Sequence, residues 1–246
     1  MRLARISEVI GLQVYLLLLA LGDSPLPAAQ GAHRFTPPPG QETPAIQSLI
    51  DSARTALAAG RTSTDLLADP TFVMAHEWPR FGQLIREHPA PTKLTLVTPQ
   101  EPGQRLTING IALDASGKPL AEALVYLYHT SARGWYSDRA AHVMAPDGDR
   151  KHARLFGYLR AAADGTFEIH TIRPAGYPDS NLPAHIHIEI QRPRQGTWWV
   201  SEIQFDDDPR LTPAAREQSR LERFVICPVE GGADGAWYLK AKFRLP

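Results

Sequence analysis

Hydrophobic and polar residues follow two different patterns along the chain, and the change falls near Lys93. Before that point, apolar residues recur every three or four positions, which is typical of amphipathic helices. Thr43-Pro44 supplies an N-cap and a first-turn proline, and Gly60 follows the last apolar position of the first segment. The pattern therefore predicts one helix between Pro44 and Gly60. It predicts a second, short helix that starts at Trp78-Pro79 and ends before Pro89.

From Lys93 onward the apolar residues alternate with period two, and turn signals interrupt them about every 8 to 12 residues. This pattern predicts a mainly β fold, with a β-sandwich core behind a short helical N-terminal section. Asp114-Ala-Ser-Gly117 and Asp164-Gly165 are expected to be hairpin turns. Long loops are expected over 130–152, 173–183 and 206–221. The expected strands are Lys93–Thr98, Arg105–Leu113, Ala123–His129, Leu155–Arg160, Thr166–Ile172, Ala184–Ile190, Trp198–Phe205, Glu222–Cys227 and Trp237–Leu245.

The first residues resemble an export signal. Arg2 and Arg5 precede the apolar run from Val14 to Leu21, and Ala29-Gln30-Gly31 offers a small-x-small cleavage site. We therefore expect a signal peptide over 1–31 and a secreted or periplasmic protein; an uncleaved amphipathic helix is the alternative. The expected division is then a signal peptide over 1–31, a helical section with linkers over 32–92, and a β-sandwich catalytic domain over 93–246.

Net charge and cysteine content limit the partners and the metal ligands that this chain can have. The 246 residues carry 26 Lys and Arg against 26 Asp and Glu, so the net charge is zero. Nucleic-acid binding requires a basic surplus, so we expect no nucleic-acid partner. The apolar run near the N-terminus is too short for a stable membrane span. Cys227 is the single cysteine, so any metal must be held by His, Tyr or carboxylate side chains.

The sharpest local feature is the segment Pro183-Ala-His-Ile-His-Ile-Glu-Ile190. Alternate residues of a strand share a face, so His185, His187 and Glu189 are expected to point the same way. Two imidazoles on one face of a rigid strand form half of a metal site. The alternative is an exposed polar face that happens to carry histidines.

Two loop tyrosines strengthen the metal hypothesis. Tyr177 lies in the turn-rich loop that enters the histidine strand, and Tyr136 lies in the loop that leaves the strand ending at His129. Phenolate is a hard anionic ligand that suits ferric iron, whereas zinc and copper sites generally prefer imidazole, thiolate or carboxylate. Two tyrosines and a His-x-His pair therefore favour Fe(III).

The stretch from Leu106 to Pro209 resembles the intradiol ring-cleavage dioxygenases, which include the catechol, hydroxyquinol and protocatechuate enzymes. The matching pieces are GIALDASGKPLAEALVYLYHTSARGWY, ADGTFEIHTIRPAGYP and PAHIHIEI, and they occur in the order found in that family. The resemblance implies a β-sandwich core. It also implies N-terminal helices that serve dimerisation in several members, so a homodimer is one expected form.

The same resemblance implies the site and the reaction. Tyr136, Tyr177, His185 and His187 are implied as the protein ligands of a mononuclear non-haem Fe(III). The implied substrates are a small aromatic diol and O2, and the ring is cleaved between its two hydroxylated carbons. One tyrosine is implied to leave the metal and act as a base. We favour Tyr177 over Tyr136 for this role.

Two positions depart from the family pattern. Leu182 stands immediately before the Pro-Ala-His motif, where family members commonly carry an arginine. Arg160, Arg173 or Arg133 could supply the missing charge from elsewhere. A glutamine found in catechol-cleaving members falls near Glu202. The candidate substrate-binding residues are Arg160, Arg173, Leu182 and Glu202.

Three other hypotheses compete with the dioxygenase. A cupin would need a glutamate shortly after the second histidine, where this chain has Gln191 and Arg192. A transthyretin-like or carboxypeptidase-regulatory-like binding module would account for Leu106–Tyr128, but it leaves the histidines and tyrosines unexplained. A metal-binding sandwich without catalysis is consistent with Leu182.

Overall fold

The computed structural model describes residues 33–34, 41–137, 143–144, 153–178, 180–196 and 198–246. The expected signal peptide over 1–31 and part of the expected loop 130–152 lie outside these residues. The chain divides into two compact units, Met1–His33 and Arg34–Pro246, and the second unit is described below. Among the described residues, no helix is long and apolar enough to cross a membrane.

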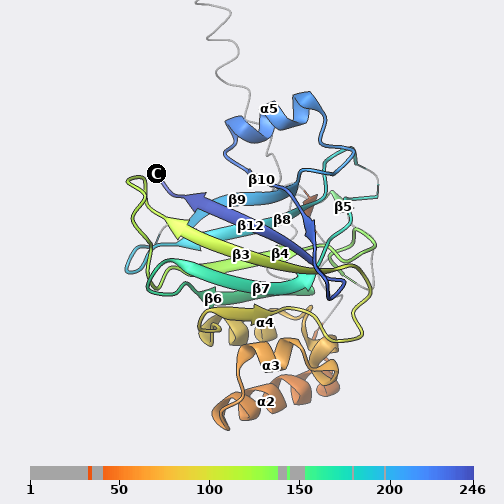
Figure 1. The fold of residues 1–246 in the computed structure, drawn as a ribbon. Coiled ribbons are helices and arrows are strands. Elements are labelled where there is room, and N and C mark those ends of the chain that lie inside the picture. The colour runs from red at the N-terminus through yellow and green to blue at the C-terminus, as the bar shows by residue number, and fades with distance from the viewer. Residues whose placement is uncertain (1–32, 35–40, 138–142, 145–152, 179, 197) are drawn as a thin grey trace, which may run out of the picture. The chain divides into compact units, whose positions relative to one another are not determined.

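Two five-stranded sheets form the body of this unit within the described residues (Figure 1). The first sheet has the order β10-β9-β8-β4-β6, and the second has the order β11-β12-β3-β7-β2. The predicted mainly β fold with a sandwich core is confirmed. The strands of the first sheet are β10 (Val225–Cys227), β9 (Trp198–Phe205), β8 (His185–Gln191), β4 (Leu124–His129) and β6 (Leu155–Arg160). Those of the second are β11 (Glu230–Gly231), β12 (Trp237–Arg244), β3 (Arg105–Leu113), β7 (Thr166–Ile172) and β2 (Lys93–Thr95). Two further two-residue strands are β1 (His33–Arg34) and β5 (Val143–Met144).

Period-two alternation buries the apolar side of the longer strands between the sheets. Ile186, Ile188 and Ile190 of β8 are completely buried. The rings of Trp199 on β9 and Phe243 on β12 meet edge to face with centroids 6.1 Å apart, so the two sheets are in direct contact. Burial of this apolar layer stabilises the sandwich, and close packing fixes the position of β8 within it.

Helices cover both open sides of the sandwich. The N-terminal ones are α2 (Pro44–Ala58), α3 (Ser63–Leu67), the 3-10 helix η1 (Pro70–Ala75) and α4 (Pro79–Glu87). The predicted α2 and α4 are confirmed, and the Thr43 hydroxyl caps α2 by accepting from the Ile46 N–H. Helices α3 and α4 contact the edge strands β2 and β6, while α5 (Pro213–Leu221) contacts β10 on the other side. Covering these edges prevents strand addition.

Several local predictions were wrong. The segment 206–221 was expected to be a loop, but it contains α5, whose Thr212 cap and Pro213 repeat the start signal of α2. Helices α3 and η1 were also not predicted. Asp164-Gly165 makes a tight turn, but not a hairpin, because the strands that it joins belong to different sheets. The turn connects the two sheets: β6 pairs with β4 in the first sheet, and β7 pairs with β3 and β2 in the second.

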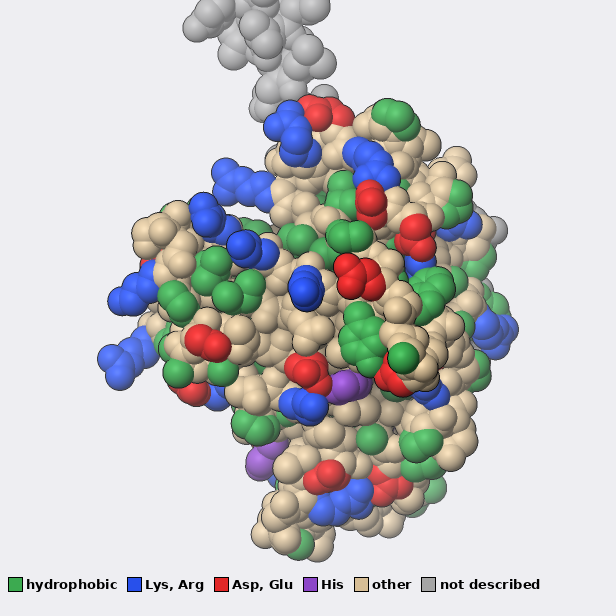
Figure 2. All heavy atoms as spheres, in the orientation of Figure 1, with side chains coloured by type: hydrophobic (Ala, Val, Ile, Leu, Met, Phe, Trp, Pro, Cys, Tyr) green, Lys and Arg blue, Asp and Glu red, His purple; other side chains and the backbone are tan. Residues whose placement is uncertain are grey.

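The outer face of the second sheet carries acidic and basic side chains side by side. Figure 2 shows both signs interspersed over this face. Lys93 Nζ, for example, lies 2.7 Å from Glu168 Oε1 on the neighbouring strand. Such exposed pairs contribute little to stability, about 0 to 1 kcal/mol each.

Candidate metal centre

Strand β8 presents both histidines on its outer face, away from the isoleucines of the core. His185 is 6% exposed and His187 is 2% exposed, so the alternative of an exposed polar face is wrong. The Nδ1 atom of His185 lies 2.8 Å from the carbonyl oxygen of Pro183, which orients the ring. Across the strand pair, the ring of Tyr128 on β4 stacks on His187 with centroids 4.5 Å apart.

A tight turn after β4 brings Tyr136 over this face. The N–H of Ser131 donates to the carbonyl of Trp135 (2.8 Å), and the N–H of Arg154 donates to the carbonyl of Tyr136 (2.9 Å). Gly134 has φ +78°, and a Cβ there would lie 2.3 Å from the carbonyl oxygen of Gly176. Glycine is therefore required both for the left-handed backbone and for the close approach of the two loops.

The loop that carries Tyr177 is tied to the loop that carries Tyr136. The Thr130 hydroxyl donates to the carbonyl of Ala175 (2.7 Å), and the Ala175 N–H donates to the carbonyl of Ser131 (3.1 Å). The Arg210 guanidinium donates to the carbonyl of Tyr177 (3.2 Å). These bonds place two phenols that are 41 positions apart in the sequence side by side.

Four heteroatoms meet in one buried cluster. The Oη atoms of Tyr136 and Tyr177 lie 2.6 Å apart, and the Nε2 atoms of His185 and His187 lie 3.2 Å apart. Tyr136 Oη lies 2.9 Å from His187 Nε2, and Tyr177 Oη lies 3.1 Å from His185 Nε2 and 3.4 Å from His187 Nε2. The structure therefore brings together all four residues that the resemblance singles out.

The proton balance of this cluster suits a cation. The Pro183 carbonyl can only accept, so the proton of a neutral His185 sits on Nδ1 and its Nε2 lone pair faces the cluster. Glu202 Oε1 lies 3.4 Å from His187 Nδ1 and favours the same tautomer there. The five short contacts among the four heteroatoms then have only the two phenol protons available as hydrogen-bond donors. A metal ion would accept lone pairs from all four heteroatoms at once, so the donor set fits a metal.

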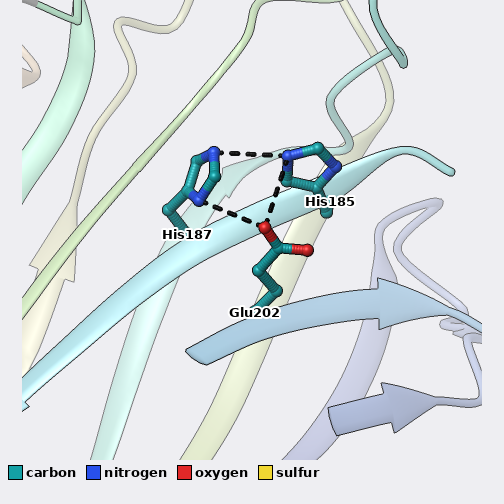
Figure 3. A group of neighbouring side chains, drawn as sticks. All are labelled: His185, His187 and Glu202. Carbon is teal, nitrogen blue, oxygen red and sulfur yellow. Dashed lines mark hydrogen bonds and ion pairs between the residues drawn. The ribbon is translucent and has the colours of Figure 1, made fainter. Parts of the chain in front are cut away.

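A carboxylate borders the two imidazoles. In Figure 3, Glu202 reaches from β9 towards His185 and His187, which stand on the same side of β8. The ligand atoms of these three residues all lie within 4.8 Å of one another, and all three side chains are buried. Glu202 was predicted as a substrate-binding candidate; the structure places it against the imidazoles. The three residues form a group that could hold a metal.

Burial sets the electrostatics of the phenols. Burial, followed by the neighbouring Tyr177, raises the pKa of Tyr136 well above its ordinary value. A phenolate here would therefore need a compensating positive charge. A bound cation supplies such a charge, so metal binding and loss of the phenol proton are coupled.

The structure does not bring the three arginine candidates to the cluster. Arg160 lies at the far end of β6, opposite Leu124, and its exposed side chain contacts the carbonyl of Glu122 (3.4 Å). Arg173 forms a bidentate ion pair with Asp207 (2.7 and 2.8 Å). The guanidinium of Arg133 lies 3.6 Å from the ring centroid of Trp135. Each of these three guanidinium groups thus contacts another group, and among the described residues none makes a hydrogen bond or ion pair with the four residues of the cluster.

Leu182 packs, partly buried, against the hydrophobic core. Sequence reasoning missed Arg210, whose guanidinium holds the Tyr177 loop through a carbonyl. No local pattern marks Arg210, because it lies 33 positions from its partner. Tyr128 was not among the candidate site residues. Its position opposite His187 could have been found from strand pairing, had the register been known.

Comparison with known proteins agrees with this geometry. A family model described as a dioxygenase matches residues 77–235. The chain is 30% identical over 144 residues to the protocatechuate 3,4-dioxygenase beta chain of Burkholderia cepacia, covering 53% of this chain and 60% of that protein. It is 32% identical over 132 residues to the chlorocatechol 1,2-dioxygenase of Rhodococcus opacus, covering 45% and 47%. The chain thus spans about half the length of these curated relatives.

Among solved structures, the catechol 1,2-dioxygenase from Pseudomonas arvilla C-1 is similar with a TM-score of 0.50 and 18% identity, over 98% of this chain and 93% of that chain. At this identity the likeness shows the fold alone. The family match is the stronger finding because it spans well over half of the chain and includes the tyrosines, the histidines and Glu202. The chain therefore belongs to the intradiol ring-cleavage dioxygenase family.

Proposed function

We propose that this protein is a non-haem Fe(III) dioxygenase that cleaves a catecholic ring between its two hydroxylated carbons, using O2. The observation that carries the proposal is the convergence of two phenols and two imidazoles within 2.6 to 3.4 Å in a buried cluster. Family membership supports the reaction type. The substrate class is a small aromatic diol.

In this proposal Tyr136, Tyr177, His185 and His187 hold the iron. A bound ferric ion supplies Lewis-acid and templating chemistry for the diol and O2. The side chains keep their donor atoms directed at one point, because the Pro183 carbonyl orients His185 and Tyr128 stacks on His187. Buried surroundings exclude bulk water from the reacting groups.

Tyr177 is the proposed base that takes a proton from the diol at its Oη atom. Ring contacts treat the two phenols alike: Tyr136 lies 5.9 and 5.8 Å from Tyr128 and Tyr177, and Tyr177 lies 5.2 Å from His185, centroid to centroid. Both backbones are also held, that of Tyr136 by Arg154 and that of Tyr177 by Arg210. The choice of Tyr177 as the phenol that is released therefore follows from the family resemblance.

Leu182 favours a second candidate, a metal-binding sandwich without ring cleavage. An apolar side chain cannot supply the positive charge expected before the Pro-Ala-His motif, and the three arginine candidates are engaged elsewhere. Oxygen uptake distinguishes the two candidates. The transthyretin-like alternative is not favoured, because it gives no role to the phenols or the imidazoles.

The deciding experiment combines metal analysis, a visible spectrum and oxygen uptake with catechol, hydroxyquinol and protocatechuate. We expect bound iron, a ferric-tyrosinate absorption band and uptake with at least one diol. Tyr177→Phe and His185→Ala are expected to abolish or strongly alter the band. The matched control Tyr126→Phe removes a buried phenol oxygen of β4 outside the cluster, and we expect it to keep the band.

Wild-type-like spectra in both Tyr177→Phe and His185→Ala would overturn the proposed ligand set. A coloured wild-type protein that consumes no oxygen with any of the three diols would instead select the metal-binding sandwich. A protein with neither iron nor colour would contradict both candidates.

A further inference from the structure

Among the described residues, Glu202 is the buried carboxylate closest to the proposed iron ligands. The pairing register of β8 and β9 determines this position. On paired strands β8 and β9, Glu202 stands directly opposite His187, and Gln204 stands opposite His185. Residues opposite one another on neighbouring strands share a face and lie in contact range. The carboxylate is therefore placed by the sheet itself and not by a loop.

The contacts of Glu202 are directed at the imidazoles. Its Oε1 atom lies 3.4 Å from His187 Nδ1 and 3.8 Å from His185 Nε2, and the residue is 2% exposed. A buried carboxylate is costly unless neighbouring groups stabilise its charge. The His187 ring lies within ion-pair distance of Glu202 Oε1 and is such a group. In return, the nearby negative charge favours the proton on Nδ1 and leaves the Nε2 lone pair facing the cluster.

A second layer holds the carboxylate. The side-chain amide of Gln204 donates to Glu202 Oε2 (3.2 Å), and the Ser219 hydroxyl donates to Gln204 Oε1 (2.7 Å). Ser219 is the buried residue of α5, and its hydroxyl also contacts the carbonyl of Ala215 (2.8 Å). A continuous line of polar contacts thus runs from α5 through β9 to β8.

We propose that Glu202 is a positioning residue of the metal centre, which orients and electronically tunes His187 and is itself held by Gln204 and Ser219. This inference rests on the proposed function, because it assumes that His187 holds iron. It differs from a substrate-binding role, since the carboxylate acts through an imidazole. It also gives helix α5 a part in the metal centre.

The test is Glu202→Gln, which removes the charge and keeps the size of the side chain. Loss of an outer partner of a metal ligand typically weakens metal binding by about 10- to 100-fold, and we expect a loss of that size in iron affinity by chelator competition. We also expect the ferric-tyrosinate band to move to longer wavelength, because a less basic His187 donates less charge to the iron. A purely structural role would leave the band unmoved.

Two further variants sharpen this test. Glu189→Gln changes a carboxylate two residues beyond His187 on the same strand, and we expect wild-type iron affinity and spectrum. Gln204→Met removes the amide donor but leaves the charge of Glu202. We expect a smaller loss of affinity and a shift of the band in the same direction.

The outcomes separate the two proposals. If the wild-type protein shows the iron band while Glu202→Gln and Gln204→Met bind iron as tightly with an unmoved band, the positioning role is overturned and the dioxygenase proposal stands. If Glu202→Gln does not fold, Gln204→Met decides by the same two measurements. A wild-type protein that binds no iron and shows no band overturns the proposed function, and the positioning role with it.

Discussion

Two buried histidines outside the candidate metal centre, His129 and His76, have pKa values well below the ordinary value. His129 is enclosed by the carbonyl oxygen of Thr130 (2.7 Å) and the hydroxyl of Thr171 (2.6 Å). Burial lowers the pKa of His129 from 6.5 to about 4. Burial likewise lowers the pKa of His76 from 6.5 to about 3. Both rings therefore stay neutral in the folded chain at pH values where the unfolded chain protonates them.

This difference predicts acid sensitivity. Below pH 6.5, His129 binds a proton in the unfolded chain, whereas in the folded chain it stays neutral down to about pH 4. The free energy of unfolding therefore decreases as the pH falls from 6.5 to about 4. Between pH 6.5 and pH 5 the expected loss from one such histidine is about 2 kcal/mol. Denaturant unfolding at both pH values measures it. We expect His129→Gln to show a smaller loss, whereas the exposed His88→Gln keeps the wild-type loss; equal losses in all three proteins would contradict the prediction.

At the scale of elements, β3 and β7 pack closely because one residue has no side chain. Gly110 of β3 stands opposite Phe167 of β7, and a Cβ on Gly110 would lie 2.2 Å from the Phe167 ring. That ring in turn stacks on Phe243 of β12, with centroids 6.2 Å apart. The aromatic ring occupies the space over the glycine, which is a known way to stabilise glycine in a strand.

Gly110→Ala is therefore expected to destabilise the sandwich. Overpacking of this kind costs about 1 to 3 kcal/mol, which denaturant unfolding resolves. The double variant Gly110→Ala/Phe167→Leu should recover part of the loss, because the smaller side chain leaves room. Gly196→Ala is the control, since nothing lies within 4 Å of the added Cβ. A Gly110→Ala protein as stable as that control would show that the ring does not fill this space.

At the scale of the whole molecule, one buried ion pair connects distant segments. Arg154, just before β6, makes a bidentate pair with Glu101, which lies between β2 and β3 (2.6 and 2.7 Å). Both side chains are buried, and Arg154 also contributes to the lowered pKa of His76 at the end of η1. The pair therefore sits where the helical section and the ends of both sheets come together.

Breaking this pair should destabilise the protein more than replacing it. Removal of one partner leaves an uncompensated buried charge, so Arg154→Met is expected to cost about 3 to 5 kcal/mol. The double variant Glu101→Leu/Arg154→Met should be more stable than the single variant, because no isolated charge remains. Thermal unfolding compares the two. Arg220→Met, at an exposed pair, is the control and should unfold close to the wild-type temperature; a double variant less stable than Arg154→Met would contradict the prediction.

Much of the fold could be predicted because it depends on neighbouring residues in the sequence. The observed bounds of β3, β6, β7 and β9 equal the predicted ones, since period-two alternation is a local property. Helix α5 was missed although Thr212-Pro213 repeats the start signal of α2, because its nine residues bury only Ser219 and lack an apolar stripe. The strands were visible in the sequence, but the partner of each strand was not.

The sequence by itself determined the alternation that puts His185 and His187 on one face, and the presence of two tyrosines in flanking loops. Only the tertiary structure decided that both phenols reach those imidazoles, that Glu202 stands opposite His187, and that Arg160 and Arg173 contact other groups. The physical reason is that alternation depends on adjacent residues. Contacts across many positions depend on strand register and loop closure, and the whole packed sandwich sets both.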